Sequence, residues 1–168
     1  ARDPYNAGMD GTLPPALHAA MSARLGDGWV AGEAGRPFGG DDSRRWAMPT
    51  AVALPRTQDD VVALVRVCRE HRMPIIARGA GTATTGAAVP TQGGVVVSFA
   101  RMNRIVDVRA ADRCVVVEPG VLNGELQHAL VPHGLFWPPD PSSADLCSVG
   151  GNLATNAGGP RAVKYGTA

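Results

Sequence analysis

The sequence predicts an α+β fold, and three observations support this class. Short runs rich in β-branched residues, VVVSF (95–99), IVDV (105–108) and CVVVE (114–118), indicate strands separated by turns. Two other segments repeat apolar residues at the spacing of an α-helix. Two glycine-rich loops, at 78–90 and 150–160, follow neither pattern. Because glycine adds nothing to a core, such loops indicate sharp turns or a surface that something approaches closely.

Length and composition narrow the class of protein. The chain has 168 residues, of which 45% are hydrophobic and 18% charged, enough for one domain or two small lobes. No apolar run approaches the roughly 20 residues of a membrane-spanning helix, so we expect no transmembrane segment. The net charge is only +1 and the arginines are scattered, which argues against nucleic-acid binding.

The cysteines and histidines indicate neither a disulfide framework nor a metal site. Cys68, Cys114 and Cys147 are odd in number and have no CxxC spacing. The four histidines form no HxH or HExxH pattern. Residues 1–10 lack the apolar stretch of a secretory signal and are expected to be poorly ordered. We therefore expect a cytoplasmic protein without a bound metal.

The N-terminal part predicts a helix followed by a linker. Residues 14–26 begin with proline, continue with alanine and leucine, and end at Gly26, as a short helix does. Residues 26–46 are rich in glycine and show no periodicity, which indicates a loop or linker. We therefore expect an N-terminal helix and linker over residues 1–44 and the main domain over 45–168.

A βαβ unit follows the linker. The run 51–55 is a short apolar strand, and Thr57 with Asp60 resembles a capping box in which aspartate replaces the usual glutamate. Pro74 prevents continuation of the helix, and 75–77 is the second strand. The residues expected on the buried face of this helix are Val61, Leu64, Val65 and Cys68.

The C-terminal half predicts one more helix and a rigid loop. The helix runs from Asn123, as its cap, to Leu130. The segment FWPPDPSS (136–143) contains three prolines, which remove backbone donors and prevent strand pairing. We expect an extended, rigid loop there.

The first glycine-rich loop, RGAGTATTGAAVP (78–90), has the composition of an anion site. Successive backbone N–H groups in a glycine-rich turn form a concavity that binds phosphate, and Thr82, Thr84 and Thr85 add hydroxyl donors. A glycine-rich hairpin without any ligand is the alternative interpretation.

Two familiar phosphate motifs fail in this loop. The dinucleotide fingerprint GxGxxG needs glycine where Thr84 stands, and no amphipathic helix follows. GTATTG supplies the GxxxxG of a Walker A loop, but Ala87 and Ala88 replace its lysine and its serine or threonine. These differences argue against phosphoryl transfer, and a cofactor diphosphate that is held without reaction fits better.

Three motifs in order resemble one family: PIIARGAGT (74–82), WPPDPSS (137–143) and SVGGNLATNAGGPRAVKYG (148–166). Together they are similar to the PCMH-type FAD-binding domain of the vanillyl-alcohol oxidase superfamily. Within it they are most similar to the glycolate oxidase FAD-linked subunit and to D-lactate and D-2-hydroxyglutarate dehydrogenases. The resemblance covers about residues 45–168.

The resemblance implies a two-lobed α+β domain with FAD between the lobes and the second lobe incomplete at the C-terminus. It implies that the substrate domain is absent, so the catalytic residues are unknown and the base is not in this chain. The residues that match cofactor-binding positions are Arg78, Gly79, Ala80, Gly81, Thr82, Thr85, Gly86, Pro139, Asp140, Ser143, Gly150, Gly151, Asn152, Thr155, Asn156, Gly158 and Gly159.

The chemistry implied by the resemblance is hydride transfer from a small 2-hydroxy acid to the flavin, because such cofactors carry the difficult step. The electron acceptor is unknown and partner subunits are left open. One alternative is a sugar-lactone or alcohol oxidase of the same superfamily, although its His-Ser pair is absent at positions 82 and 83. The other is a truncated flavin-binding module without catalysis.

The resemblance also predicts that FAD is held without a covalent bond. Residues 78–90 contain no histidine, and Cys147 is the only cysteine near the second loop. Relatives carry glycine where this sequence has Ala83 and Ala87, which weakens the loop if either position needs a positive φ. Tyr165 and Gly166 fit the closing turn of the family, although the tyrosine could equally be a packed ring.

Overall fold

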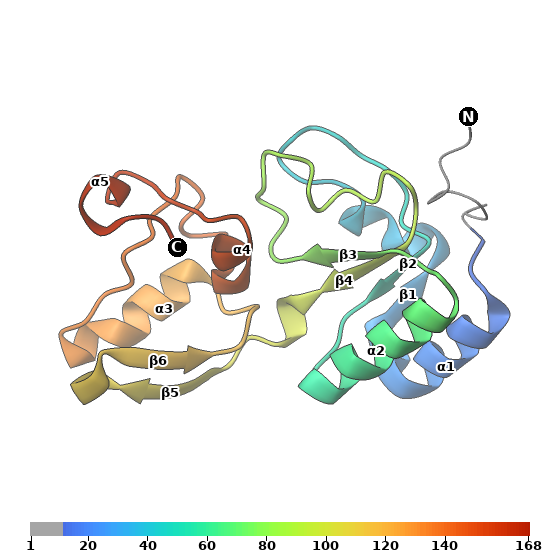
Figure 1. Ribbon diagram of the computed structural model, residues 1–168, viewed down its shortest axis with the longest axis horizontal. Helices are drawn as coiled ribbons and strands as arrows, with labels where there is room; N and C mark the ends of the chain where they lie inside the picture. The colour runs from blue at the N-terminus through green and yellow to red at the C-terminus, as the bar shows by residue number, and fades with distance from the viewer. Residues whose placement is uncertain (1–11) are drawn as a thin grey trace. The chain divides into compact units, whose positions relative to one another are not determined.

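The computed structural model describes residues 12–168, so the expected disorder of residues 1–10 lies outside the described residues. Helices and strands are mixed, as predicted (Figure 1). The chain forms two compact units. The first comprises residues 12–77 with Thr84–Ser98, and the second comprises Arg78–Ala83 with Phe99–Ala168.

The first unit is built on a four-stranded sheet of order β1-β2-β4-β3. The strands are β1 (Trp29–Ala31), β2 (Ala51–Ala53), β3 (Ile75–Arg78) and β4 (Val95–Ser98). β1 runs antiparallel to β2, and β2 runs parallel to β4. Every residue of β2 and β4 is buried, because these apolar strands lie at the centre of the sheet. β3 occupies an edge and is partly exposed.

Helices α1 (Pro15–Leu25) and α2 (Gln58–Glu70) lie side by side and pack in this unit (Figure 1). Their buried side chains are Leu17, Met21, Leu64 and Cys68. Val65 was expected on the same face but is 45% exposed. The buried face of α2 is therefore narrower than predicted. It is centred on Leu64 and Cys68, which lie four residues apart on the same side of the helix. Burial raises the pKa of the Cys68 thiol to about 11.

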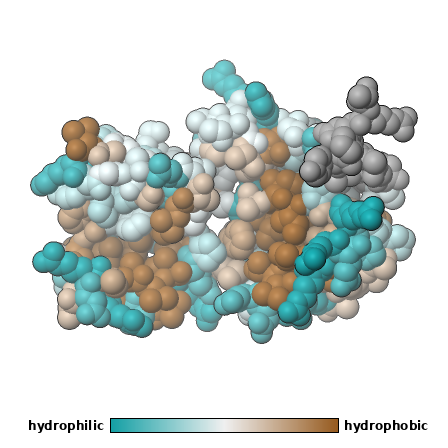
Figure 2. Space-filling model, in the orientation of Figure 1, coloured by the Kyte–Doolittle hydropathy of each residue, from teal (hydrophilic) through white to brown (hydrophobic). Residues whose placement is uncertain are grey.

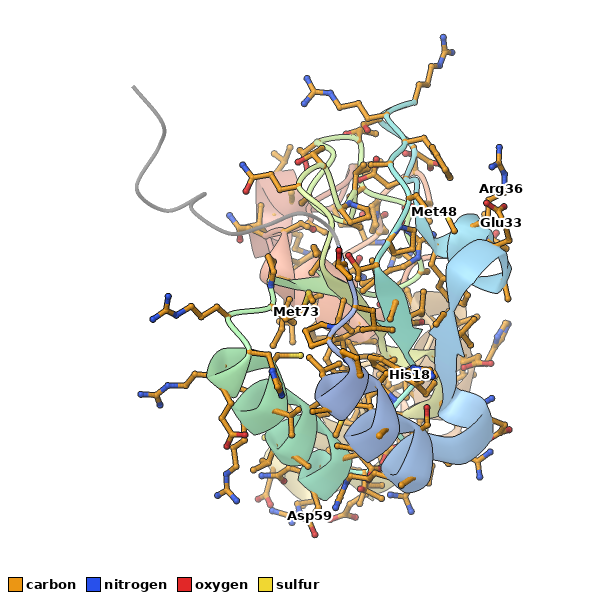
Figure 3. The ribbon with its side chains drawn as sticks, turned by 90° about the vertical axis from the view of Figure 1, so that its right-hand side faces the viewer. His18, Glu33, Arg36, Met48, Asp59 and Met73 are labelled. Carbon is orange, nitrogen blue, oxygen red and sulfur yellow. The ribbon has the colours of Figure 1, made fainter. Side chains whose placement is uncertain are left out.

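The segment predicted as a linker contains strand β1, so that prediction was wrong for these residues. Two 3-10 helices, η1 (Gly26–Gly28) and η2 (Gly32–Phe38), flank β1. The Trp29 indole N–H donates to Nδ1 of His18 at 2.9 Å. Figure 3 shows His18 on α1. A run as short as β1 carries no periodicity, so its pairing with β2 depends on tertiary contacts.

The second unit contains an antiparallel pair, β5 (Ile105–Arg109) and β6 (Cys114–Val117), under helix α3 (Asn123–Leu130). Apolar surface gathers over α3 and this hairpin (Figure 2). The buried core of the unit is Val121, Leu126, Leu130 and Val149. Its remaining elements are α4 (Val149–Ala154), α5 (Ala162–Tyr165), η3 (Phe99–Arg101), η4 (Ala110–Asp112) and η5 (Val131–His133).

The N-cap of helix α3 lies one residue earlier than predicted. Its N-cap is Leu122, whose backbone N–H donates to the Glu125 carboxylate at 3.3 Å. Asn123 was expected as the cap but lies within the first turn, and its side chain is buried. The amide is used for a tertiary contact rather than for capping.

The predicted capping box of α2 is confirmed. Asp60 N–H donates to Thr57 Oγ1 at 3.1 Å, and the Asp60 carboxylate accepts from the Thr57 N–H at 3.2 Å. Partial burial opposes ionisation of Asp60. The hydrogen bonds from the Arg56 N–H and from Thr57, with the charge of Arg24, outweigh it and lower the pKa of this carboxyl.

We predict that Asp60→Asn lowers the free energy of unfolding by about 1 kcal/mol at neutral pH, the typical size of a lost cap. Because the folded-state pKa of Asp60 is lowered, its contribution is present above the unfolded-state pKa and is lost as pH falls through the folded-state pKa. Denaturant unfolding from pH 7 to pH 2 measures this.

The control for this prediction is Asp59→Asn, in the same first turn but exposed and directed to solvent (Figure 3). It should change stability by only a few tenths of a kcal/mol. Equal effects of the two substitutions, or an Asp60→Asn difference that does not shrink at low pH, would contradict the assignment.

Candidate functional site

The first glycine-rich loop begins where β3 ends, at Arg78. Two glycines of this loop, Gly79 and Gly81, belong to the second unit, and different neighbours restrict them. Gly81 has φ +79°, and a Cβ added there would overlap the Arg78 guanidinium. Arg78 therefore folds back over its own loop, and its cation lies beside the Gly81 backbone. Gly81 is required both for its backbone conformation and for this close approach.

Gly79 packs against Ser148, the residue just before α4. A Cβ on Gly79 would overlap Ser148 Oγ and would lie 3.4 Å from Gly151 Cα. The two predicted cofactor segments, 78–82 and 150–159, therefore touch within the second unit. Among the described residues, the backbone N–H groups of residues 80–83 have no hydrogen-bond acceptor. These are the groups that an anion-binding turn supplies.

The other predicted residues of this loop, Thr85 and Gly86, belong to the first unit. Gly86 has φ +81°, and a Cβ there would lie 3.3 Å from Arg45 Cδ. The Asp41 carboxylate holds the following turn by accepting from the Ala88 N–H at 3.4 Å. Glycine is thus required at position 86 because its φ is positive and because the Arg45 side chain lies close to it.

The second loop was read as a loop, but its first part is helix α4. Ser148 caps it, because Ser148 Oγ accepts from the Gly151 N–H at 3.2 Å. The Val149 N–H donates to Val121 O at 2.8 Å and the Gly150 N–H donates to Pro119 O at 2.9 Å. The N-terminal N–H groups of α4 are therefore already satisfied, and this helix end offers no anion site.

The adjacent glycines of α4 face different surroundings. A Cβ on Gly150 would lie 2.6 Å from Pro119 Cβ and 2.7 Å from Pro119 O, so the close packing of the chain itself requires glycine. A Cβ on Gly151 would meet only Ser148 Oγ, at 3.1 Å. Apart from this one tight contact with the cap hydroxyl, the chain does not fill the space beside Gly151.

The polar side chains of the second loop make internal hydrogen bonds. Asn152 is 3% exposed, and its Nδ2 donates to Oδ1 of Asn123 at 2.9 Å. Thr155 Oγ1 donates to the Gly151 carbonyl at 2.9 Å, and Thr167 Oγ1 donates to Asn156 Oδ1 at 2.7 Å. Asn152, predicted as a cofactor contact, thus has its amide nitrogen engaged inside the unit.

The proline-rich segment is tied to the end of the second loop. The Asp140 N–H donates to Gly158 O at 3.2 Å, and the Asp140 carboxylate accepts from the Arg161 N–H at 3.1 Å. Arg161 Nε also lies 3.3 Å from Asp140 Oδ2. Gly159 has φ +128°, and a Cβ there would overlap the Asp140 carbonyl. Asp140 therefore holds residues 158–161 in place.

Of the other predicted residues in the proline-rich segment, Pro139 is buried. Ser143 forms backbone hydrogen bonds that hold the turn after this segment. The Ser143 carbonyl accepts from the N–H groups of Leu146 and Cys147, each at 2.8 Å. This turn leads directly to the α4 cap. Cys147 itself is 4% exposed, as a small apolar filler is.

Three residues that hold these segments were missed by sequence reasoning: Asn123, Gln127 and Ser148. A serine before an apolar run is the signature of a helix N-cap, which could have identified Ser148. Asn123 and Gln127 are four residues apart on α3, but nothing in the sequence indicates what their amides bind.

The structure answers two questions left open by the sequence: whether Ala83 and Ala87 strain the loop, and whether Tyr165 is a packed ring. Neither Ala83 nor Ala87 adopts a positive φ, so alanine causes no backbone strain at these positions. The Tyr165 ring packs edge-on against Phe136 with centroids 5.3 Å apart, and Gly166 has φ +81° after α5. The closing turn and the packed ring are therefore both present.

The described residues contain no cluster of His, Cys, Asp and Glu suited to a metal ion. No helix among residues 12–168 is both long and apolar enough to cross a membrane.

Comparisons with known proteins identify the family of this chain. Residues 49–168 match the family described as FAD binding domain. The glycolate oxidase subunit GlcD of Bacillus subtilis (strain 168) is 42% identical over 120 residues, which are 71% of this chain and 26% of that protein. The D-2-hydroxyglutarate dehydrogenase of Stutzerimonas stutzeri (strain A1501) is 38% identical over 130 residues, 77% of this chain and 28% of that protein.

The chain thus spans about a quarter of the length of these curated relatives. Among solved structures, an alkyldihydroxyacetonephosphate synthase superposes with a TM-score of 0.82 at 25% identity, over 93% of this chain and 34% of that chain. The matches confirm the resemblance inferred from the three motifs and the predicted α+β fold class.

The two adjacent glycines give a matched test. Gly151→Ala should cost little stability, because the one tight contact of its methyl group is with the Ser148 hydroxyl. It should weaken FAD binding at least tenfold, because the methyl group otherwise enters space the chain does not fill. Gly150→Ala should lower the free energy of unfolding by roughly 1–3 kcal/mol through overpacking against Pro119. Both changes gain the same helix propensity.

Thermal unfolding and FAD fluorescence titration, each on both variants, separate the two effects. A Gly151→Ala protein that is stable and binds FAD like the wild type would show that no cofactor approaches this glycine.

Proposed function

The chain belongs to the family of FAD binding domains, and we propose that it is the cofactor-binding part of an enzyme that oxidises a 2-hydroxy acid. The observation that carries the proposal is the loop 78–83 against α4, which combines unpaired N–H groups with a cation and glycine backbone. The names of two relatives, a glycolate oxidase subunit and a D-2-hydroxyglutarate dehydrogenase, support the substrate class.

The described residues fit FAD in different roles. The N–H groups of residues 80–83, with the Arg78 guanidinium, suit the negative charge of the diphosphate. The α4 segment suits an uncharged part of the cofactor, because its N–H groups are used and Gly151 leaves room. When bound, the flavin supplies the two-electron chemistry, and the protein supplies position and electrostatics.

We further propose that the base comes from outside this chain. His18 accepts from Trp29, His71 is exposed at the C-terminal end of α2, and His128 and His133 are exposed on or beside α3. None lies in the two loops. The subunit name of one relative supports partner subunits. Three free cysteines support a reducing compartment, and we propose the cytoplasm.

The substrate proposal predicts that the full-length protein, purified with FAD, is bleached anaerobically by glycolate or by a D-2-hydroxy acid. A sugar lactone or a simple alcohol should leave the flavin oxidised. Absorbance near the flavin band follows the reaction. The isolated 168-residue chain is the control and should show no turnover, because we propose that the base lies outside it. Bleaching by the lactone alone would reverse the choice of substrate class.

The attachment of the flavin gives a separate prediction. FAD should leave the protein on acid denaturation, because residues 78–90 hold no histidine and the Cys147 thiol is buried. The measurement is flavin fluorescence of the supernatant and of the washed pellet. Fluorescence that stays with the polypeptide in the wild type, and is lost in Cys147→Ala, would show a covalent bond.

A further inference from the structure

Helix α3 presents two side-chain amides on one face. Asn123 and Gln127 are four residues apart, so they lie on successive turns of the same side. Each amide holds a different segment of the predicted cofactor site. Neither residue resembles a cofactor contact in the sequence.

Asn123 holds the beginning of α4. It is 1% exposed, its Oδ1 accepts from Asn152 Nδ2 at 2.9 Å, and its backbone N–H donates to Cys147 O at 2.8 Å. A buried amide that lost this partner would keep an unsatisfied polar group, which is costly. The α4 segment is therefore fixed relative to α3.

Gln127 holds the proline-rich segment by the backbone of Trp137. Its Oε1 accepts from the Trp137 N–H at 3.2 Å, and its Nε2 donates to the Trp137 carbonyl. Pro138 and Pro139 follow and have no N–H to donate, so this part of the chain has few groups to anchor it. Gln127 uses both backbone groups of the last residue before the prolines.

The anchored segment continues to Asp140, which in turn holds residues 158–161. A shift at Trp137 would therefore move Pro139 and Asp140 together with the end of the second loop. Trp137 also packs its ring against the core that contains Val121 and Leu126.

We infer that Gln127 is a positioning residue for the flavin: it sets the location of residues 137–140 relative to α4, which Asn123 fixes to the same helix face. The inference rests on the FAD binding that the proposed function requires, and not on which 2-hydroxy acid is oxidised.

The test compares three variants of the full-length protein. Gln127→Met keeps the size of the side chain and removes both hydrogen bonds. Gln127→Glu keeps the acceptor for the Trp137 N–H and removes the donor. His128→Gln, at the next, exposed position of α3, is the matched control. The probe is FAD, and the readouts are its dissociation constant, the visible circular dichroism of the bound flavin and the melting temperature of the apoprotein.

We expect Gln127→Met to raise the FAD dissociation constant about tenfold, the factor for losing roughly one net hydrogen bond, and to change the flavin dichroism. Gln127→Glu, whose second carboxylate oxygen would face the Trp137 carbonyl, should weaken FAD binding at least as much. His128→Gln should match the wild type. If Gln127→Met fails to fold, the Glu variant decides by the same readouts.

A lower melting temperature with unchanged FAD affinity and unchanged dichroism would overturn the inference, because Gln127 would then serve stability alone. Wild-type protein that takes up no FAD overturns this inference and the proposed function together. Wild-type protein that binds FAD but is not reduced by any 2-hydroxy acid overturns only the substrate proposal.

Discussion

The second unit depends on the hydrogen-bonded junction between residues 119–123 and 147–150. Val149 and Gly150 donate to the carbonyls of Val121 and Pro119, and Asn123 donates to the carbonyl of Cys147. These bonds satisfy the first N–H groups of α4 within the chain itself. The close approach explains why a residue larger than glycine does not fit at position 150.

The close approach of chain segments also explains several of the glycines. Gly79, Gly150 and Gly159 each lie where a Cβ would meet Ser148, Pro119 or Asp140. Their first requirement is packing of one loop on another, which brings the predicted cofactor segments together. Gly151 differs because the chain fills little of the space beside it. The glycine-rich motif thus contains glycines that packing requires and one, Gly151, beside which the chain fills little of the space.

The polar residues divide in a similar way. Asp140, Asn152 and Gln127 form hydrogen bonds within the unit, so their first role is to hold segments of backbone. The backbone N–H groups of residues 80–83 have no such partners among the described residues. The site that we propose would present backbone groups to FAD, while its side chains maintain the geometry, as preorganised sites require.

The sequence by itself determined the α+β class, the α2 capping box and the position of the two glycine-rich loops, because these depend on local propensity and on spacing along the chain. It did not determine β1, the helical start of the second loop or the partners of Asn123 and Gln127. Strand β1 has three residues and becomes a strand only by pairing with β2. The amides of α3 meet residues 10 and 29 positions away in the chain. Such contacts follow from tertiary packing, which local pattern does not encode.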